Sequence, residues 1–276
     1  MRLVGPWLIL LIVLAGSPLE AADVFLGTSK GRAEKIAVWI PAFGGAARSK
    51  GSGPSQGSSE ALSEVQLVES VFKDDLNRLQ LFNLIDFVKS GSPVDFTNGP
   101  DQNVITLARG AGVFAIAWAK VYPLSGQWVM EAHAYETGRG EPVIRVKMKA
   151  DSPRPLAHRF TDKLVAYFTG EKGISETLIV YLSQQDKGKE IYIMDYDGLN
   201  KMKLTADQSI ILSPRWSFDA TRIGYTSYFQ GPPNVYFLDL ASRQRRKVIS
   251  SKGVSFAPSW SPKGDRMAFC STREGN

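Results

Sequence analysis

Cysteine and histidine are scarce in this sequence of 276 residues, which contains one cysteine, Cys270, and two histidines, His133 and His158. A single cysteine cannot form an internal disulfide, so the fold must depend on core packing. The strand pattern around Cys270 predicts a buried, inert thiol. Neither histidine has a cysteine, histidine or carboxylate nearby in the sequence at metal-ligand spacing. We therefore expect no metal and no cofactor, and we interpret both histidines as surface or packing residues.

Long apolar runs are absent except at the N-terminus. Arg2 precedes a run over residues 3–14, which is shorter than the roughly 20 residues that a membrane-spanning helix needs. Small residues follow the run, and this order is typical of a cleaved signal peptide. We predict a signal peptide over residues 1–22, cleaved near Ala21 or Ala22, and therefore export of the chain. A retained membrane anchor is the alternative.

Motifs for catalysis and nucleic-acid binding are missing as well. Residues 53–57 formally match Gly-x-Ser-x-Gly, but a nucleophile elbow needs a strand-to-helix turn, and this match lies in a glycine- and serine-rich stretch. Asp195, Asp197 and Gly198 resemble part of a calcium loop without its other ligands, so we predict a tight turn there. The net charge of +6 is modest, and no nucleic-acid motif accompanies the basic cluster at residues 243–247. We expect no enzyme and no nucleic-acid binding, and an acidic protein partner fits this basic cluster better.

The first half of the mature chain has mixed periodicity. Apolar residues at spacings of three and four predict a helix up to residue 79 and a second helix that begins after Ser152 as N-cap and ends before Gly170. Alternating patterns predict strands at residues 35–43, 84–88, 113–121, 128–135 and 143–149. The glycine- and serine-rich residues 44–59 predict a flexible insert. We expect residues 23–172 to form an N-terminal α/β sandwich-like domain.

Beyond residue 172 the sequence repeats itself with a period of 44 residues. The repeated Pro-x-Trp-Ser segments fall in register without gaps, and they comprise Pro214, Trp216 and Ser217 in one copy and Pro258, Trp260 and Ser261 in the other. Such a period with several short strands is typical of a β-propeller with WD40-like (PD40) repeats. We predict a partial propeller over residues 173–276, about two blades and a fragment, in an α+β two-domain protein. The two tryptophans are then expected to pack between blades, with a ligand-stacking platform as the alternative.

With these residues placed, the chain resembles the TolB family of the Tol-Pal system. The resemblance rests on the junction over residues 168–173, the strand at residues 179–181, the turn at residues 195–198 and the two Pro-x-Trp-Ser repeats. Three features depart from the family pattern: the long insert after Phe43, Phe218 in place of a proline after Trp-Ser, and the absence of several blades. The resemblance implies an incomplete TolB-type β-propeller.

The resemblance also implies a function. TolB-like proteins are periplasmic scaffolds without catalysis that bind the lipoprotein Pal and the inner-membrane protein TolA, and that maintain the outer membrane and its constriction during division. We expect the full-length protein to be monomeric and to reach membranes through these partners. The loops that match the Pal-facing loops of the family contain Ser209, Ile210, Ile211 and Leu212 in one repeat and Gly253, Val254, Ser255 and Phe256 in the other. The segment that corresponds to the TolA-binding segment contains Asp23, Val24, Phe25 and Leu26.

Two alternatives remain open from the sequence. Some of the apolar residues in the Pal-facing loops can instead turn inward as blade core. The propeller can also belong to an exported serine peptidase whose catalytic domain follows Asn276, because propellers of this repeat type precede peptidase domains.

Overall fold

The N-terminal part of the chain is built on one mixed sheet. The structure is a computed structural model that describes residues 35–45, 56–87, 99–248 and 253–272. The predicted signal peptide and the segment containing Asp23, Val24, Phe25 and Leu26 lie outside these residues. The sheet has the order β2-β1-β3-β4-β5, with β1 parallel to β2 and β3 and the remaining pairs antiparallel. Its strands are β1 (Ile36–Trp39), β2 (Phe82–Leu84), β3 (Ala115–Leu124), β4 (Gln127–Glu136) and β5 (Pro142–Ala150).

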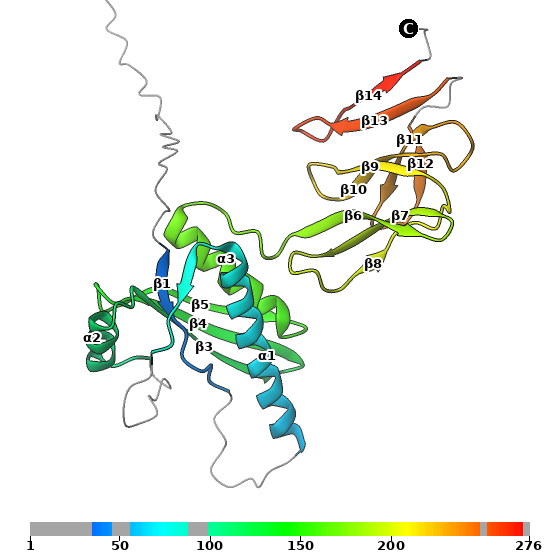
Figure 1. Cartoon of the computed structure of the whole chain (residues 1–276). Helices are drawn as coiled ribbons and strands as arrows, with labels where there is room; N and C mark the ends of the chain where they lie inside the picture. Colours follow the sequence, from blue (N-terminus) through cyan, green and yellow to red (C-terminus); the bar gives the residue numbers. More distant parts are fainter. Residues whose placement is uncertain (1–34, 46–55, 88–98, 249–252, 273–276) are drawn as a thin grey trace, which may run out of the picture. The chain divides into compact units, whose positions relative to one another are not determined.

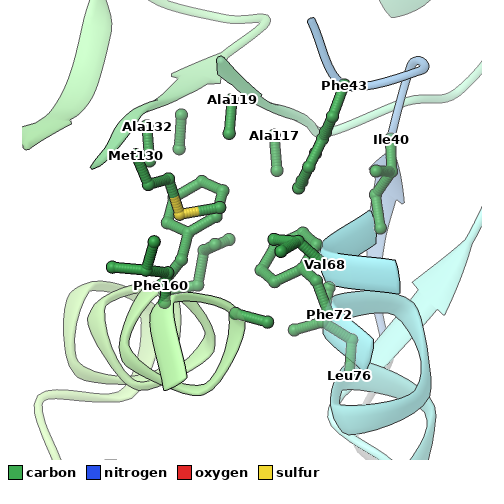
Figure 2. Close-up of a cluster of buried hydrophobic side chains, with 14 of the residues drawn as sticks. Ile40, Phe43, Val68, Phe72, Leu76, Ala117, Ala119, Met130, Ala132 and Phe160 are labelled. Atoms are coloured by element: carbon green, nitrogen blue, oxygen red, sulfur yellow. The ribbon is translucent and has the colours of Figure 1, made fainter. Parts of the chain in front are cut away.

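Helices lie on both faces of this sheet, and Figure 1 shows α1 (Gln56–Leu79) and α3 (Arg154–Thr169) together against β3, β4 and β5. Helices α1 and α3 lie on one face, and the stripe of Val68, Phe72 and Leu76 on α1 packs against Phe160 of α3 and the small side chains of β3 and β4. Figure 2 shows this core, in which the Phe72 and Phe160 rings stack with centroids 4.6 Å apart. Helix α2 (Gln102–Gly110) covers part of the other face.

The C-terminal part consists of three smaller sheets, which do not close into a ring within the described residues. The first has the order β6-β7-β8, the second β12-β11-β10-β9, and the third pairs β13 with β14. Their strands are β6 (Leu178–Gln185), β7 (Gly188–Asp195), β8 (Met202–Lys203), β9 (Ile211–Trp216), β10 (Arg222–Ser227), β11 (Asn234–Asp239), β12 (Arg245–Lys247), β13 (Ser255–Trp260) and β14 (Met267–Ser271).

The strand positions follow the sequence repeat. Strand β13 begins and ends 44 residues after β9, since Ser255 follows Ile211 and Trp260 follows Trp216 by that spacing. The turn after each of these strands contains a left-handed residue at the equivalent position, Ala220 with φ 54° and Gly264 with φ 72°. Each sheet is therefore one copy, whole or partial, of the same four-strand unit.

Several local expectations differ from the structure. Helix α2 was not expected, although Asp101 caps it by accepting a hydrogen bond from Val104 N at 2.8 Å. Ser152 is not the N-cap of α3, because the helix begins after Pro153 without a side-chain cap, whereas Gly170 ends the helix in the left-handed conformation as expected. Residues 56–59, placed in the predicted insert, form the first turn of α1. Cys270 is exposed rather than buried, because no further sheet covers this side of β14 within the described residues.

Candidate partner-binding surface

The two segments expected to face a partner divide into buried and exposed residues. Ile211 is fully buried and belongs to the core of the C-terminal sheets, and Ser255 is buried too. Ile210, Leu212 and Phe256 are 53%, 39% and 41% exposed. The sequence left open whether these apolar residues face a partner or turn inward as blade core, and Ile211 turns inward. The exposed apolar residues of the two segments are therefore Ile210 and Leu212, on either side of Ile211, and Phe256, next to Ser255.

A β-bulge interrupts both segments at the same position of the repeat. Ser213 and Ala257, which are 44 residues apart, have left-handed backbones with φ 52° and 56°. The pairing of β9 with β10 and of β13 with β14 shifts its register next to these residues. A bulge of this kind re-aims the side chains around it. Neither residue is a glycine, so no glycine marked the bulges in the sequence.

Hydrogen bonds hold the segment before β9 in place. The backbone N–H of Lys189 donates to the carbonyl of Ser209 at 2.9 Å. The buried Glu190 carboxylate accepts from Thr205 Oγ1 at 2.6 Å and from the backbone N–H groups of Asp207 and Gln208 at 3.0 and 2.9 Å. Burial acts to raise the pKa of Glu190, but these hydrogen bonds outweigh it and hold the pKa below its usual range. The carboxylate is thus an ionised anchor for this loop.

Aromatic residues after β10 extend the exposed apolar surface. The N–H of Tyr228 donates to the carbonyl of Ile210 at 3.0 Å, which places the two residues side by side. The next residue, Phe229, is exposed and lies under the Arg245 guanidinium, 3.9 Å from the ring centroid. Arg245 also forms an ion pair with Asp207. The sequence placed Arg245 in a basic cluster that fits an acidic partner, but it did not reveal Tyr228 and Phe229 beside that cluster.

The two repeat tryptophans lie differently in the structure. Trp216 is half-buried and packs against the core of the C-terminal sheets. Trp260 lies beside Gly224 of the preceding sheet, where an added Cβ would be 3.0 Å from Trp260 Nε1 and 2.9 Å from Met267 Cε. The absence of a side chain at Gly224 therefore lets β13 and β14 approach β10 closely.

A second cluster of titratable residues joins α1, α3 and the turn after β7. His158 Nδ1 lies 2.6 Å from Asp75 Oδ2, and His158 Nε2 lies 3.7 Å from Asp197 Oδ2. These residue types suit a metal ion, but Arg78 lies 3.3 Å from Asp75 and Arg154 pairs with Asp197. The arginines compensate the carboxylates, so we interpret the cluster as an ion-pair network. Sequence spacing could not reveal it, because His158 and Asp75 are 83 residues apart.

The C-terminal sheets are similar in sequence to a known protein family. Residues 165–276 match the family described as the TolB beta propeller domain. This match covers the C-terminal sheets and the end of α3. A Tol-Pal system protein TolB from Desulfosudis oleivorans is 30% identical over 186 residues, which cover 64% of this chain and 41% of that protein. The Tol-Pal system protein TolB of Anaeromyxobacter dehalogenans is 34% identical over 182 residues, covering 64% of this chain and 42% of the relative.

The fold agrees with this assignment. The crystal structure of TolB from Acinetobacter baumannii superposes with a TM-score of 0.69 at 20% identity, over 88% of this chain and 57% of that one. The predicted resemblance to TolB and the predicted fold class, an α/β part followed by an incomplete TolB-type propeller, are confirmed. The chain spans less than half the length of the two relatives from Desulfosudis and Anaeromyxobacter. No helix within the described ranges is long and apolar enough to cross a membrane.

Proposed function

We propose that the protein is a periplasmic scaffold of the Tol-Pal system that binds Pal through its propeller and TolA through the segment at residues 23–26. In this role it acts without catalysis and helps to maintain the outer membrane and its constriction during division. The proposal extends the names of the relatives, which are Tol-Pal system proteins, to this chain. The boundary between the two domains at residues 172 and 173 is part of the same proposal.

The observation that carries the proposal is the exposed apolar surface of the TolB-type segment. Ile210, Leu212 and Phe256 protrude beside a buried residue of each strand, and Phe229 extends the surface under Arg245. Aromatic and arginine side chains are enriched in protein interfaces, and Phe229, Phe256 and Arg245 are of these types. A charged side chain placed there should oppose burial against a partner.

The opposite end of the same sheets offers a matched control. Ser209, the neighbour of Ile210 in the sequence, pairs with Lys189 at the start of β7. Leu199 follows the opposite end of β7, and its side chain is 53% exposed, as is that of Ile210. Phe218 follows the end of β9 and is 74% exposed. Substitutions at Leu199 and Phe218 therefore replace the same kinds of exposed apolar side chain as those at Ile210 and Phe256, and they leave the candidate surface unaltered.

The test compares two double variants of the chain in a pull-down with purified Pal. We expect Ile210→Asp with Phe256→Asp to weaken binding at least tenfold, and Leu199→Asp with Phe218→Asp to leave binding within twofold of the original. Equal binding by both folded variants would reject this surface. Loss of binding in the control pair alone would move the Pal site to the other end of the sheets.

A further inference from the structure

The outer edge of β5 is available for pairing. Within the described residues its only sheet neighbour is β4, so β5 forms one edge of the N-terminal sheet (Figure 1). The carbonyl of Lys149 accepts a hydrogen bond from Arg159 Nη1 of α3 at 2.8 Å, so this carbonyl points away from β4. In a strand the N–H and C=O of one residue point to the same side, and the side alternates along the chain. The peptide groups of Arg145 and Lys147 therefore point to the free edge.

The residues with outward peptide groups also carry the positive charge of this edge. Arg145, Lys147 and Lys149 are exposed and share the face of the sheet on which α2 lies. Lys147 Nζ contacts Glu131 of β4 at 2.8 Å. The hydrogen bond from Lys147, followed by one from Tyr122, holds the pKa of Glu131 below its usual range, so this carboxylate is ionised and already engaged. No ion pair within the described ranges involves Arg145 or Lys149, so their charges lack a carboxylate partner.

The other face of β5 is apolar. Val146 and Met148 are half-buried and pack against the core that α3 covers. Their side chains alternate with the basic ones, because successive side chains of a strand point to opposite faces. A strand added beside β5 would thus meet positive charge on one face and an apolar surface on the other.

We propose that the free edge of β5 binds an extended acidic segment of another polypeptide, with carboxylates opposite Arg145 and Lys147 and an apolar side chain opposite Val146. Residues directly opposite each other in paired strands have side chains on the same face, so this alternation follows from the geometry of β5. Strand addition gives affinity through main-chain hydrogen bonds and specificity through alternate side chains. Basic side chains also keep two β5 edges apart by repulsion, which leaves an acidic strand as the matching partner.

The experiment uses the 276-residue chain and three synthetic peptides of equal length. The probe alternates glutamate with valine, one control alternates lysine with valine, and the other has the composition of the probe with its glutamates in one block. We expect the alternating acidic peptide to bind, with affinity falling as salt rises, and the two controls to bind at least tenfold more weakly. Equal binding of the block peptide would overturn the proposal, because charge alone would then explain the binding.

Variants separate charge from backbone pairing. Arg145→Ala removes the charge and keeps the N–H, whereas Arg145→Pro also removes the N–H, and an edge strand tolerates proline where its N–H faces outward. We expect a loss of about fivefold for Arg145→Ala and a further loss of about fivefold for Arg145→Pro. Lys120→Glu, on β3 in the same face and away from the edge, is the matched control for net charge and should change binding less than Arg145→Glu.

Hydrogen exchange tests the proposal in the unaltered chain, where folding of a variant is not at issue. Bound peptide should slow exchange of the Arg145 and Lys147 amides and leave the amide of Val146, which faces β4, unchanged. Two results would overturn the proposal: Arg145→Pro that binds as well as Arg145→Ala, or bound peptide without added protection at Arg145 and Lys147.

Discussion

The N-terminal sheet and the C-terminal sheets bury their strands by different means. In the N-terminal sheet, α1 and α3 cover one face and α2 covers part of the other, and residues of β3 and β4 such as Val121 and Met130 are fully buried. The C-terminal sheets rely on one another, and β14, the last strand of the series, has no buried residue from Met267 to Ser271. Large exposed apolar side chains, including Ile210, Phe218 and Phe256, lie on these sheets. The larger buried core therefore lies in the helix-covered part, and the exposed apolar residues of the proposed partner surface lie in the other.

The largest effect is expected in the helix-covered core. Phe72→Ala removes a fully buried ring that stacks on Phe160, so the free energy of unfolding should fall by about 4 kcal/mol, measured by urea denaturation. Phe218→Ala removes the same side chain from an exposed turn of the C-terminal part and should change stability by less than about 0.5 kcal/mol. If both variants lowered the free energy of unfolding by a similar amount, the helix-covered core would not contribute more to stability than the exposed turn.

The ion-pair network around His158 should give the next largest effect. His158→Ala leaves the buried Asp75 carboxylate without its hydrogen bond at 2.6 Å, and the expected loss is about 3 kcal/mol in the same denaturation experiment. Arg159→Ala removes the exposed pair with Glu176 and the exposed hydrogen bond to the Lys149 carbonyl, and it should cost about 1 kcal/mol, less than the loss of the buried His158 contact. If Arg159→Ala costs as much as His158→Ala, burial is not what makes the His158 network important.

The Glu190 anchor should make the C-terminal sheets sensitive to acid. Because the pKa of Glu190 is lowered in the folded state, its contribution is complete above the pKa of an ordinary glutamate and is lost as pH falls through the lower, folded-state value. Glu190→Gln should cost about 2 kcal/mol at neutral pH. The difference between the two proteins should shrink as pH falls, as followed by thermal unfolding between pH 7 and 3. A difference that is constant with pH would argue against an ionised anchor.

The turn after each repeated strand should give the smallest effect. Ala220→Gly relieves a left-handed alanine and should stabilise the chain by about 1 kcal/mol, whereas Gly264→Ala imposes the same strain and should destabilise it by a similar amount. The equivalent positions in the two copies make each variant the control of the other. Changes of equal sign in thermal unfolding would show that the two turns are not equivalent.

The sequence repeat predicted the positions of the C-terminal strands, but it did not predict the bulges in them or which of their residues are buried. The ungapped spacing from Trp216 to Trp260 predicted β9 and β13 in equivalent positions, because a sequence repeat of this period indicates a repeated structural unit. The bulges at Ser213 and Ala257 lacked a glycine signal, and the burial of Ile211 depends on neighbouring sheets that a local pattern does not describe. Helix α2 was missed because it has only nine residues, although its cap at Asp101 was a usable signal.

We propose that Pal binds where Ile210, Phe229 and Phe256 are exposed. Hydrogen exchange of the chain with and without Pal is the most direct test of this proposal. We expect slower exchange at the amides of Tyr228 and Phe229, next to Ile210, and unchanged exchange at Gly198 and Ala220 in the turns at the other end of the sheets. Protection of Gly198 and Ala220 without protection of Tyr228 and Phe229 would contradict it.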